Sequence, residues 1–194
     1  MDFSEVVRQR RAVREYRDVP VDRALIERLI GVAVLAPSAM NLQPWAFAVI
    51  TGMEQIDECA RRAKEHLLTH GSPTSSRMRE LLSDAKLSIF YHAPALVLVL
   101  ARSDESQAKE DCCLAAQTFM LAARDAGLGT CWIGLGRPWL DLAETKTELA
   151  IPADYHVVAP IVLGFPKAWP PSHERKPPEI HWTESPADGS QPAG

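Results

Sequence analysis

Arginines gather near the beginning of the chain and offer anion-binding chemistry. Five of them stand between residues 8 and 17: Arg8, Arg10, Arg11, Arg14 and Arg17. This segment follows a helix-like pattern and precedes Pro20, so its guanidinium groups converge on a loop. Guanidinium groups can hold a phosphate through paired N–H donors. A solvated basic face is the alternative reading, while Glu15 and Asp18 interrupt the charge and argue against a nucleic-acid arm.

Two further segments carry polar side chains that simple connections do not require. The stretch PSAMNLQPW, residues 37 to 45, places Asn41, Gln43 and Trp45 at every second position. A connecting turn would use the proline, serine and asparagine but not this alternation. Near the end of the chain, Arg175 and Lys176 stand just before two prolines. That pair serves solubility unless the tail folds back onto the first arginines.

Other catalytic and nucleotide-binding motifs are missing from the sequence. The glycines of GLGTCWIGLG do not form a dinucleotide fingerprint, because Trp132 replaces the third glycine and a helix precedes them. Neither a phosphate-binding G-x-x-x-x-G-K-S/T loop nor a G-x-S-x-G hydrolase motif occurs. The six histidines lack metal-ligand spacing. We therefore expect neither a metal site nor a nucleophilic catalytic side chain.

Composition places the chain among ordinary globular proteins. Its 194 residues fit one domain, with 46% hydrophobic and 24% charged residues. The net charge of −4 gives no reason to expect nucleic-acid or anionic-membrane binding. The four cysteines form no C-x-x-C, and the first residues do not resemble a signal peptide. The longest apolar run, 93–101, is too short to span a bilayer. We expect a cytoplasmic protein with reduced cysteines.

Hydrophobic periodicity predicts helices alternating with four short strands. Helices are expected at 2–10 and 21–36, around Ile56–Leu67 and Met78–Ile89, and at 109–127 and 140–150. Strands are expected at 45–50, 95–101, 129–134 and 156–164, with a loop at 70–77 and an extended proline-rich tail after residue 164. This order predicts a sheet covered by helices on both faces. Helix 109–127 is apolar nearly all round, which favours a partner subunit.

Four of these segments together resemble the nitroreductase family of FMN-dependent oxidoreductases. They are RRAVREY, APSAMNLQPWAF, GLGTCWIG after an alanine-rich helix, and IVLGFP followed by RKP. The resemblance covers roughly residues 1 to 182, which leaves 183–194 as an extended or disordered tail. It implies an α+β fold: a three-layer α/β/α sandwich with a central, mostly antiparallel sheet, in an intertwined homodimer that shares its FMN sites.

The resemblance also implies roles for individual residues. Arg10 and Arg175 would clamp the FMN phosphate, with Arg11 and Lys176 nearby, and Arg14 would face the N1 and O2 edge of the flavin. The partner chain would supply Pro37, Ser38, Ala39 and Asn41, and the amide of Gln43 would add a contact. The ring would lie along the backbone of Cys131, Trp132, Ile133 and Gly134, while Trp45 would start the strand as a packing residue. Ala12 departs from the family's usual serine, so one hydroxyl contact is lost.

The implied activity is a ping-pong reaction without an essential acid or base. NAD(P)H would reduce FMN, and a nitroaromatic, quinone or similar small electrophile would reoxidise it. Reductive dehalogenation and breakdown of the flavin itself remain alternatives on the same fold, although the short 70–77 loop speaks mildly against a lid for them. A non-catalytic flavin-binding protein and a basic-loop interaction module are the readings from other classes.

Overall fold

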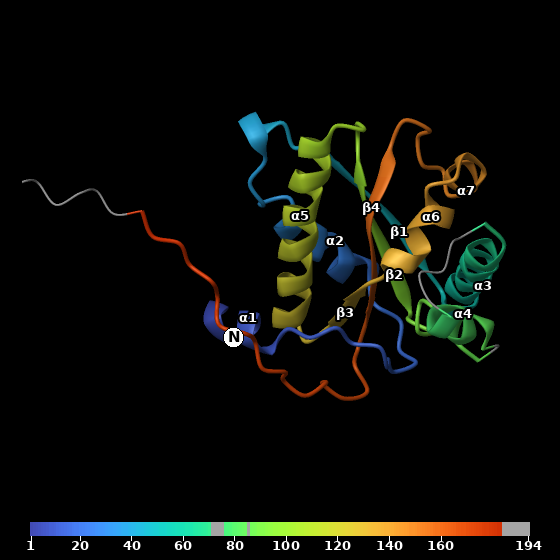
Figure 1. Ribbon diagram of the computed structural model, residues 1–194, viewed down its shortest axis with the longest axis horizontal. Helices are drawn as coiled ribbons and strands as arrows, with labels where there is room; N and C mark the ends of the chain where they lie inside the picture. Colours follow the sequence, from blue (N-terminus) through green and yellow to red (C-terminus); the bar gives the residue numbers. More distant parts are fainter. Residues whose placement is uncertain (71–75, 85, 184–194) are drawn as a thin grey trace, which may run out of the picture.

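The computed structural model describes residues 1–70, 76–84 and 86–183, and it contains a four-stranded sheet between two helical layers (Figure 1). The strands are β1 (Trp45–Thr51), β2 (Ala95–Ala101), β3 (Gly129–Trp132) and β4 (His156–Gly164). They follow the order β1-β2-β4-β3, and every neighbouring pair is antiparallel. The expected α+β sandwich with an antiparallel sheet is confirmed.

The central strands are apolar on both faces because a helical layer covers each face. Along β2, Leu96, Leu98 and Leu100 belong to one core, and the alternating alanines and valines belong to the other. Helices α2 (Arg23–Ala33) and α5 (Ser106–Asp125) cover the second core (Figure 1). The first core lies under α3 (Met53–His70), α4 (Ser76–Ser83), α6 (Arg137–Leu140) and α7 (Ala143–Glu148). A strand buried on both faces reads as a continuous apolar run, as β2 does.

Local capping explains several of the boundaries that the sequence predicted. Helix α1 (Phe3–Gln9) begins after Asp2, whose carboxylate accepts the backbone N–H of Glu5 at 2.9 Å. Asp22 caps α2 in the same way through the N–H of Ala24. Helix α5 ends at Asp125, and Gly127, two residues later, adopts the φ of +77° that glycine commonly takes just beyond a helix C-terminus.

Two predicted helices differ most from the structure. The helix expected through Ile89 ends at Ser83, and Ile89 is buried in a turn instead; the predicted position Ala85 lies outside the described residues, as do 71–75 of the predicted loop. Asp84 accepts the N–H of Lys86 at 2.9 Å, so a local turn competes with the helix. The helix expected at 140–150 spans only Ala143–Glu148, and α6 precedes it unpredicted.

The long helix α5 is less enclosed than its composition suggested. It buries one side against the sheet, yet Leu114 is 46% exposed and its neighbour Cys113 is also exposed. The single chain therefore leaves Cys113 and Leu114 of α5 uncovered. After β4, the described chain through residue 183 forms neither helix nor ladder strand, as the prolines predicted; residues 184–194 of the expected tail are outside the description. No helix in the described ranges is long and apolar enough to cross a membrane.

We predict that Gly129 is required for the close approach of the N-terminal segment to β3. A Cβ at Gly129 would lie 2.6 Å from Cγ2 of the buried Val13, so Gly129→Ala forces a shift in the core. Overpacking of this kind costs about 1–3 kcal/mol of unfolding free energy, which chemical denaturation measures.

Gly31→Ala is the matched control for that substitution. Gly31 lies within α2, where an added Cβ meets no atom within 4 Å, so the change should stabilise the protein by up to about 1 kcal/mol. Equal unfolding free energies for the two variants would contradict the packing account.

Candidate functional site

The N-terminal arginines are positioned by backbone pairing along the edge of the sheet. Ala12 forms a parallel bridge with Thr130 of β3, and the N–H of Val13 donates to the carbonyl of Thr130 at 2.9 Å. Further along, the N–H of Arg17 donates to the carbonyl of Phe165 at 2.8 Å, and Tyr16 bridges to Pro166. Residues 12–17 therefore lie beside the end of β4, where the tail begins.

Arg10, Arg11 and Arg175 form a cluster of cations without counter-ions. Burial lowers the pKa of Arg10 from its ordinary value, and the charges of Arg11 and Arg175 lower it further. Within the described part of the chain, none of the three forms an ion pair with a carboxylate. The Nε of Arg11 is buried and has no hydrogen-bond partner among these residues. Like charges gathered in this way favour an anionic ligand.

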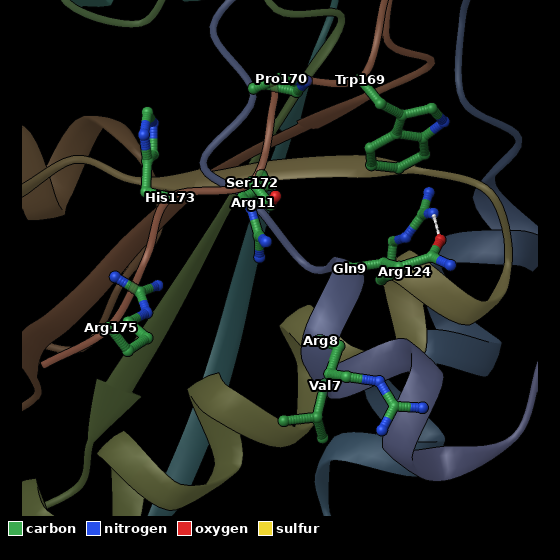
Figure 2. Close-up of a pocket in the computed structure, with 10 residues that line it drawn as sticks. All are labelled: Val7, Arg8, Gln9, Arg11, Arg124, Trp169, Pro170, Ser172, His173 and Arg175. Carbon is green, nitrogen blue, oxygen red and sulfur yellow. Dashed lines mark hydrogen bonds between the residues drawn. The ribbon is translucent and has the colours of Figure 1, made fainter. Parts of the chain in front are cut away.

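The structure brings Arg175 but not Lys176 to these arginines. The tail returns along α1, and Figure 2 shows Arg175 and Arg11 on the walls of one pocket of about 660 Å³. Lys176 is exposed, and it does not line this pocket. The tail thus folds back onto the first arginines, but it brings only Arg175 of the basic pair to them.

Arg14 stands apart from this cluster, beside a tyrosine that the sequence did not indicate. Its Nε–H donates to the hydroxyl of Tyr91 at 3.2 Å, and the guanidinium carbon lies 5.8 Å from the centre of the Tyr91 ring. The pKa of Arg14 is raised, chiefly by its electrostatic interaction with Cys131 and also by Tyr91. Burial raises the pKa of the Cys131 thiol despite the nearby arginines, so that thiol is neutral at pH 7.

The segment 131–134 forms a ledge beside Arg10 and Arg14. Cys131 and Ile133 turn into the core, whereas Trp132 is 36% exposed and Gly134 is exposed. The N–H of Ile133 donates to the carbonyl of Pro160 at 2.8 Å, which fixes the ledge to β4. No atom lies within 4 Å of a Cβ placed on Gly134. The ledge therefore offers backbone and open space to a flat ligand.

The segment 37–43 is a tight loop held by its own polar side chains. The N–H of Gln43 donates to Oγ of Ser38 at 3.0 Å, and its side-chain amide donates to Oδ1 of Asn41 at 3.2 Å. Met40, Asn41 and Gln43 all have φ near +50°, a conformation that asparagine tolerates better than most residues. Pro37, Asn41 and Gln43 are exposed, and Met40 at its tip is 91% exposed. Trp45 is buried at the start of β1, as expected of a packing residue.

Asp111 anchors this loop from within α5, and sequence reasoning missed it. Its carboxylate, in a residue only 2% exposed, accepts the N–H of Ala39 at 3.2 Å and the amide of Gln107 at 3.2 Å. A carboxylate inside an apolar helix is uncommon unless it is paired. Asp111, an acidic residue in an otherwise apolar helical segment, was therefore a sequence signal for a buried polar contact.

The loop and the arginines lie at opposite ends of α5 (Figure 1). Ala39 binds Asp111 in the first third of the helix, whereas Arg124 near its end hydrogen-bonds Gln9 of α1. A helix of 20 residues is about 30 Å long. One chain therefore brings together Arg10, Arg11, Ala12, Arg14, residues 131–134 and Arg175, but it does not bring Pro37, Ser38, Ala39, Asn41 or Gln43 to them.

The arrangement can bind an anion at one end and a flat ring along the ledge. The described residues contain no group of three His, Cys, Asp or Glu side chains that could hold a metal ion. The donors are instead guanidinium groups and backbone, which suit a phosphorylated aromatic molecule. An antiparallel sheet between helical layers carries this cationic site at its edge. The family model for the nitroreductase family matches residues 7–165, and the chain belongs to that family.

Individual relatives and solved structures carry more than one chemistry. A 4-nitrobenzoate reductase of Nocardioides sp. (strain LMS-CY) is 30% identical over 221 residues, covering 93% of this chain and 89% of that protein. A 5,6-dimethylbenzimidazole synthase of Rhodospirillum rubrum is 29% identical over 176 residues, covering 81% and 79%. The crystal structure of a nitroreductase with bound FMN from Bacteroides fragilis superposes with a TM-score of 0.83 at 25% identity, covering 95% of this chain and all of that one.

We predict that Asp111 stabilises the loop 37–43 through its buried hydrogen bonds. Asp111→Ala leaves the N–H of Ala39 unpaired, and a hydrogen bond to a charged group is worth about 1.5–3 kcal/mol. The unfolding free energy should fall by that amount in denaturant titrations. Glu110→Ala, at an exposed position of the same helix, should change it by about 0.5 kcal/mol or less. Equal losses in both variants would mean that the loop does not depend on the carboxylate.

Proposed function

We propose that the protein is an FMN-dependent oxidoreductase that takes hydride from NAD(P)H and reduces a nitroaromatic, a quinone or a similar small electrophile. The observation that carries this proposal is the unneutralised cluster of Arg10, Arg11 and Arg175 at the end of the ledge 131–134. Membership of the nitroreductase family and the FMN-bound structural relative support it.

The residues at the sheet edge fit FMN by their donor chemistry. Arg10 and Arg175 would hold the phosphate, with Arg11 beside them, because a dianion takes two or more guanidinium forks. The unpartnered Nε of Arg11 is a donor that such an anion can satisfy. Ala12 has no hydroxyl to contribute, so that position offers backbone alone. Lys176, which the structure leaves exposed, would add long-range charge.

The ledge would orient the ring while Arg14 adjusts its electrostatics. Backbone groups of residues 131–134 would lie along the isoalloxazine, whose open side is the space above Gly134. Arg14, held by the Tyr91 hydroxyl, would place a fixed cation at the N1 and O2 edge. A preorganised cation stabilises negative charge that develops during a reaction. The neutral thiol of Cys131 leaves that cation uncompensated.

A second copy of the chain would complete the site. Pro37, Ser38, Ala39, Asn41 and Gln43 lie at the far end of α5 from the arginines of their own chain. A twofold partner that packs its α5 antiparallel against this one would carry its 37–43 loop toward the ledge. Leu114, an exposed apolar residue of α5, would contribute apolar surface to this homodimer. The amide of Gln43 would then orient Asn41 toward the cofactor.

The cofactor supplies the redox chemistry in this scheme. FMN held by Arg10, Arg11 and Arg175 would supply hydride transfer from NAD(P)H to a small electrophile that takes the same place afterwards. The side chains bind, orient and exclude water, and none is needed as a nucleophile. The ledge carries no free carboxylate or histidine, so protons would come from water or from the substrate.

Breakdown of the flavin itself is the second candidate, because a 5,6-dimethylbenzimidazole synthase is among the relatives.

Absorption spectroscopy separates the candidates. The purified protein should be yellow, and anaerobic NADPH should bleach the flavin band. Adding a quinone or 4-nitrobenzoate should restore that band with repeated turnover. A colourless protein that FMN cannot reconstitute contradicts the proposal. If the flavin band is lost and neither acceptor restores it, the result favours flavin breakdown. If NAD(P)H never bleaches the bound flavin, the result favours a non-catalytic flavoprotein.

We predict that phosphate binding and redox tuning can be separated by mutation. Arg10→Ala or Arg175→Ala should weaken FMN binding by about 1.5–3 kcal/mol, the range for hydrogen bonds to charged groups. This corresponds to a loss of roughly tenfold to a hundredfold in affinity. The midpoint potential of the remaining bound flavin should barely change, because the phosphate lies far from the ring.

Arg14→Met should produce the opposite profile. The midpoint potential should fall and hydride uptake should slow, because the cation acts on charge that appears only upon reduction. The loss of affinity for oxidised FMN should be smaller than in Arg175→Ala. Titrations of affinity and of potential on each variant measure the two effects, with Arg28→Ala on α2 as the charge-matched control. Identical profiles for Arg14→Met and Arg175→Ala would show that the division of roles is wrong.

A further inference from the structure

Arg8 and Arg124 join Arg11 and Arg175 of the first cluster around a pocket that does not include the ledge 131–134. The pocket has a volume of about 660 Å³. Its lining includes Arg8, Arg11, Arg124, Arg175, Trp169 and His173 (Figure 2). Arg10, Arg14 and residues 131–134 do not line it. The pocket therefore opens on another side of the arginine segment from the surface assigned to the flavin ring.

The charges in this pocket have no counter-ion. Its lining contains no Asp or Glu, and neither Arg8 nor Arg124 forms an ion pair with a carboxylate of the described residues. The Nε atoms of Arg11 and Arg124 are both buried there without hydrogen-bond partners. Burial lowers the pKa of Arg124, Glu5 opposes that shift, and the charge of Arg11 adds to it. Two desolvated guanidinium groups close enough to repel one another favour a bound anion.

The pocket is also built for more than a bare ion. Arg124 lies over the ring of Trp169, with its guanidinium carbon 3.5 Å from the ring centre, and it donates to the side chain of Gln9. Pro170 and Val7 add apolar surface to the lining. Pockets of about 300–1,000 Å³ with aromatic walls and a few placed polar groups take small organic ligands. In the view of Figure 2, Arg11 lies between Arg124 and Arg175, so cations from the N-terminal segment, from α5 and from the tail line the same pocket.

We propose that this pocket binds a phosphorylated nucleoside, and that in the proposed function it receives the 2′-phosphoadenosine end of NADPH. This inference rests on the proposed function for its substrate. Arg8 and Arg124 supply fork donors for the 2′-phosphate, which NADH lacks, and Arg11, assigned above to the flavin phosphate, adds its charge from the boundary of the pocket. The Trp169 and Pro170 wall provides apolar surface for the base. Arg175, at the boundary, is shared with the flavin phosphate. The chain would thereby prefer NADPH to NADH.

Calorimetric titration of the full-length protein with three non-reactive probes tests the inference. The probes are adenosine 2′,5′-bisphosphate, adenosine 5′-monophosphate and inorganic pyrophosphate. The bisphosphate should bind about tenfold or more tightly than the monophosphate, because one more phosphoryl group meets the guanidinium donors. It should also bind more tightly than pyrophosphate, which carries similar charge but no base. Equal affinity for bisphosphate and monophosphate, or for bisphosphate and pyrophosphate, overturns the proposal.

Two pocket variants and one control assign the effect to the pocket. Arg124→Gln and Arg8→Gln should each weaken bisphosphate binding by about tenfold. Arg8 is exposed and has no ion pair to lose, so its variant tests the proposal even if Arg124→Gln disturbs the fold. Arg28→Gln, an exposed arginine of α2, removes the same charge elsewhere and should bind normally. If Arg8→Gln binds the bisphosphate normally, and a correctly folded Arg124→Gln does so too, the assignment is contradicted.

The flavin content of each sample, read from its absorption, keeps the two proposals apart. Protein that binds the bisphosphate but takes up no FMN would refute the proposed function and leave the pocket assignment standing. Yellow protein that NADPH reduces, but that does not distinguish the bisphosphate from the monophosphate, would refute the pocket assignment alone.

Discussion

Repulsion among arginines that lack counter-ions is the interaction on which the rest of this structure depends. Burial and the charges of Arg11 and Arg175 lower the pKa of Arg10, and no carboxylate of the described chain forms an ion pair with any of the three. Gathered cations destabilise a fold unless an anion joins them. The unpaired cluster lowers the stability of the folded chain, and a bound ligand with concentrated negative charge would offset that cost.

Backbone pairing holds those arginines in place against their repulsion. The backbone N–H of Val13 donates to the carbonyl of Thr130, and the backbone N–H of Lys167 donates to the carbonyl of Glu15. The hydroxyl of the buried Tyr16 donates to the carbonyl of Val13 at 2.7 Å. Gly129 and Gly164 allow this close approach, since a Cβ on Gly164 would lie 2.8 Å from the ring of Tyr16. The glycines flanking the sheet edge thus connect packing to binding: without them the arginine segment could not lie against β3 and β4.

Much of this arrangement could be predicted from the sequence, because local signals decide it. Asp2, Asp22 and Gly127 mark helix ends through their own side chains or φ angle, and the short, valine-rich apolar run of β2 favours a strand covered on both faces. The return of Arg175 to the first arginines was predictable only from the family resemblance. Tyr91, Asp111 and Arg124 were missed because their partners lie 77, 72 and 115 residues away, where no local pattern reports them. The shared site stays a prediction, since one chain holds only its two separated halves.

The affinity of the flavin-free protein for FMN and for riboflavin tests the central claim most directly. The two ligands share the ring and ribityl chain and differ only in the phosphate that the arginine cluster is held to bind. The account predicts that FMN binds about a hundredfold or more tightly, as two charge-assisted contacts would give. That advantage should shrink as salt is raised and should largely disappear in the Arg10→Ala/Arg175→Ala double variant. Equal affinity for FMN and riboflavin in the unmodified protein would contradict it.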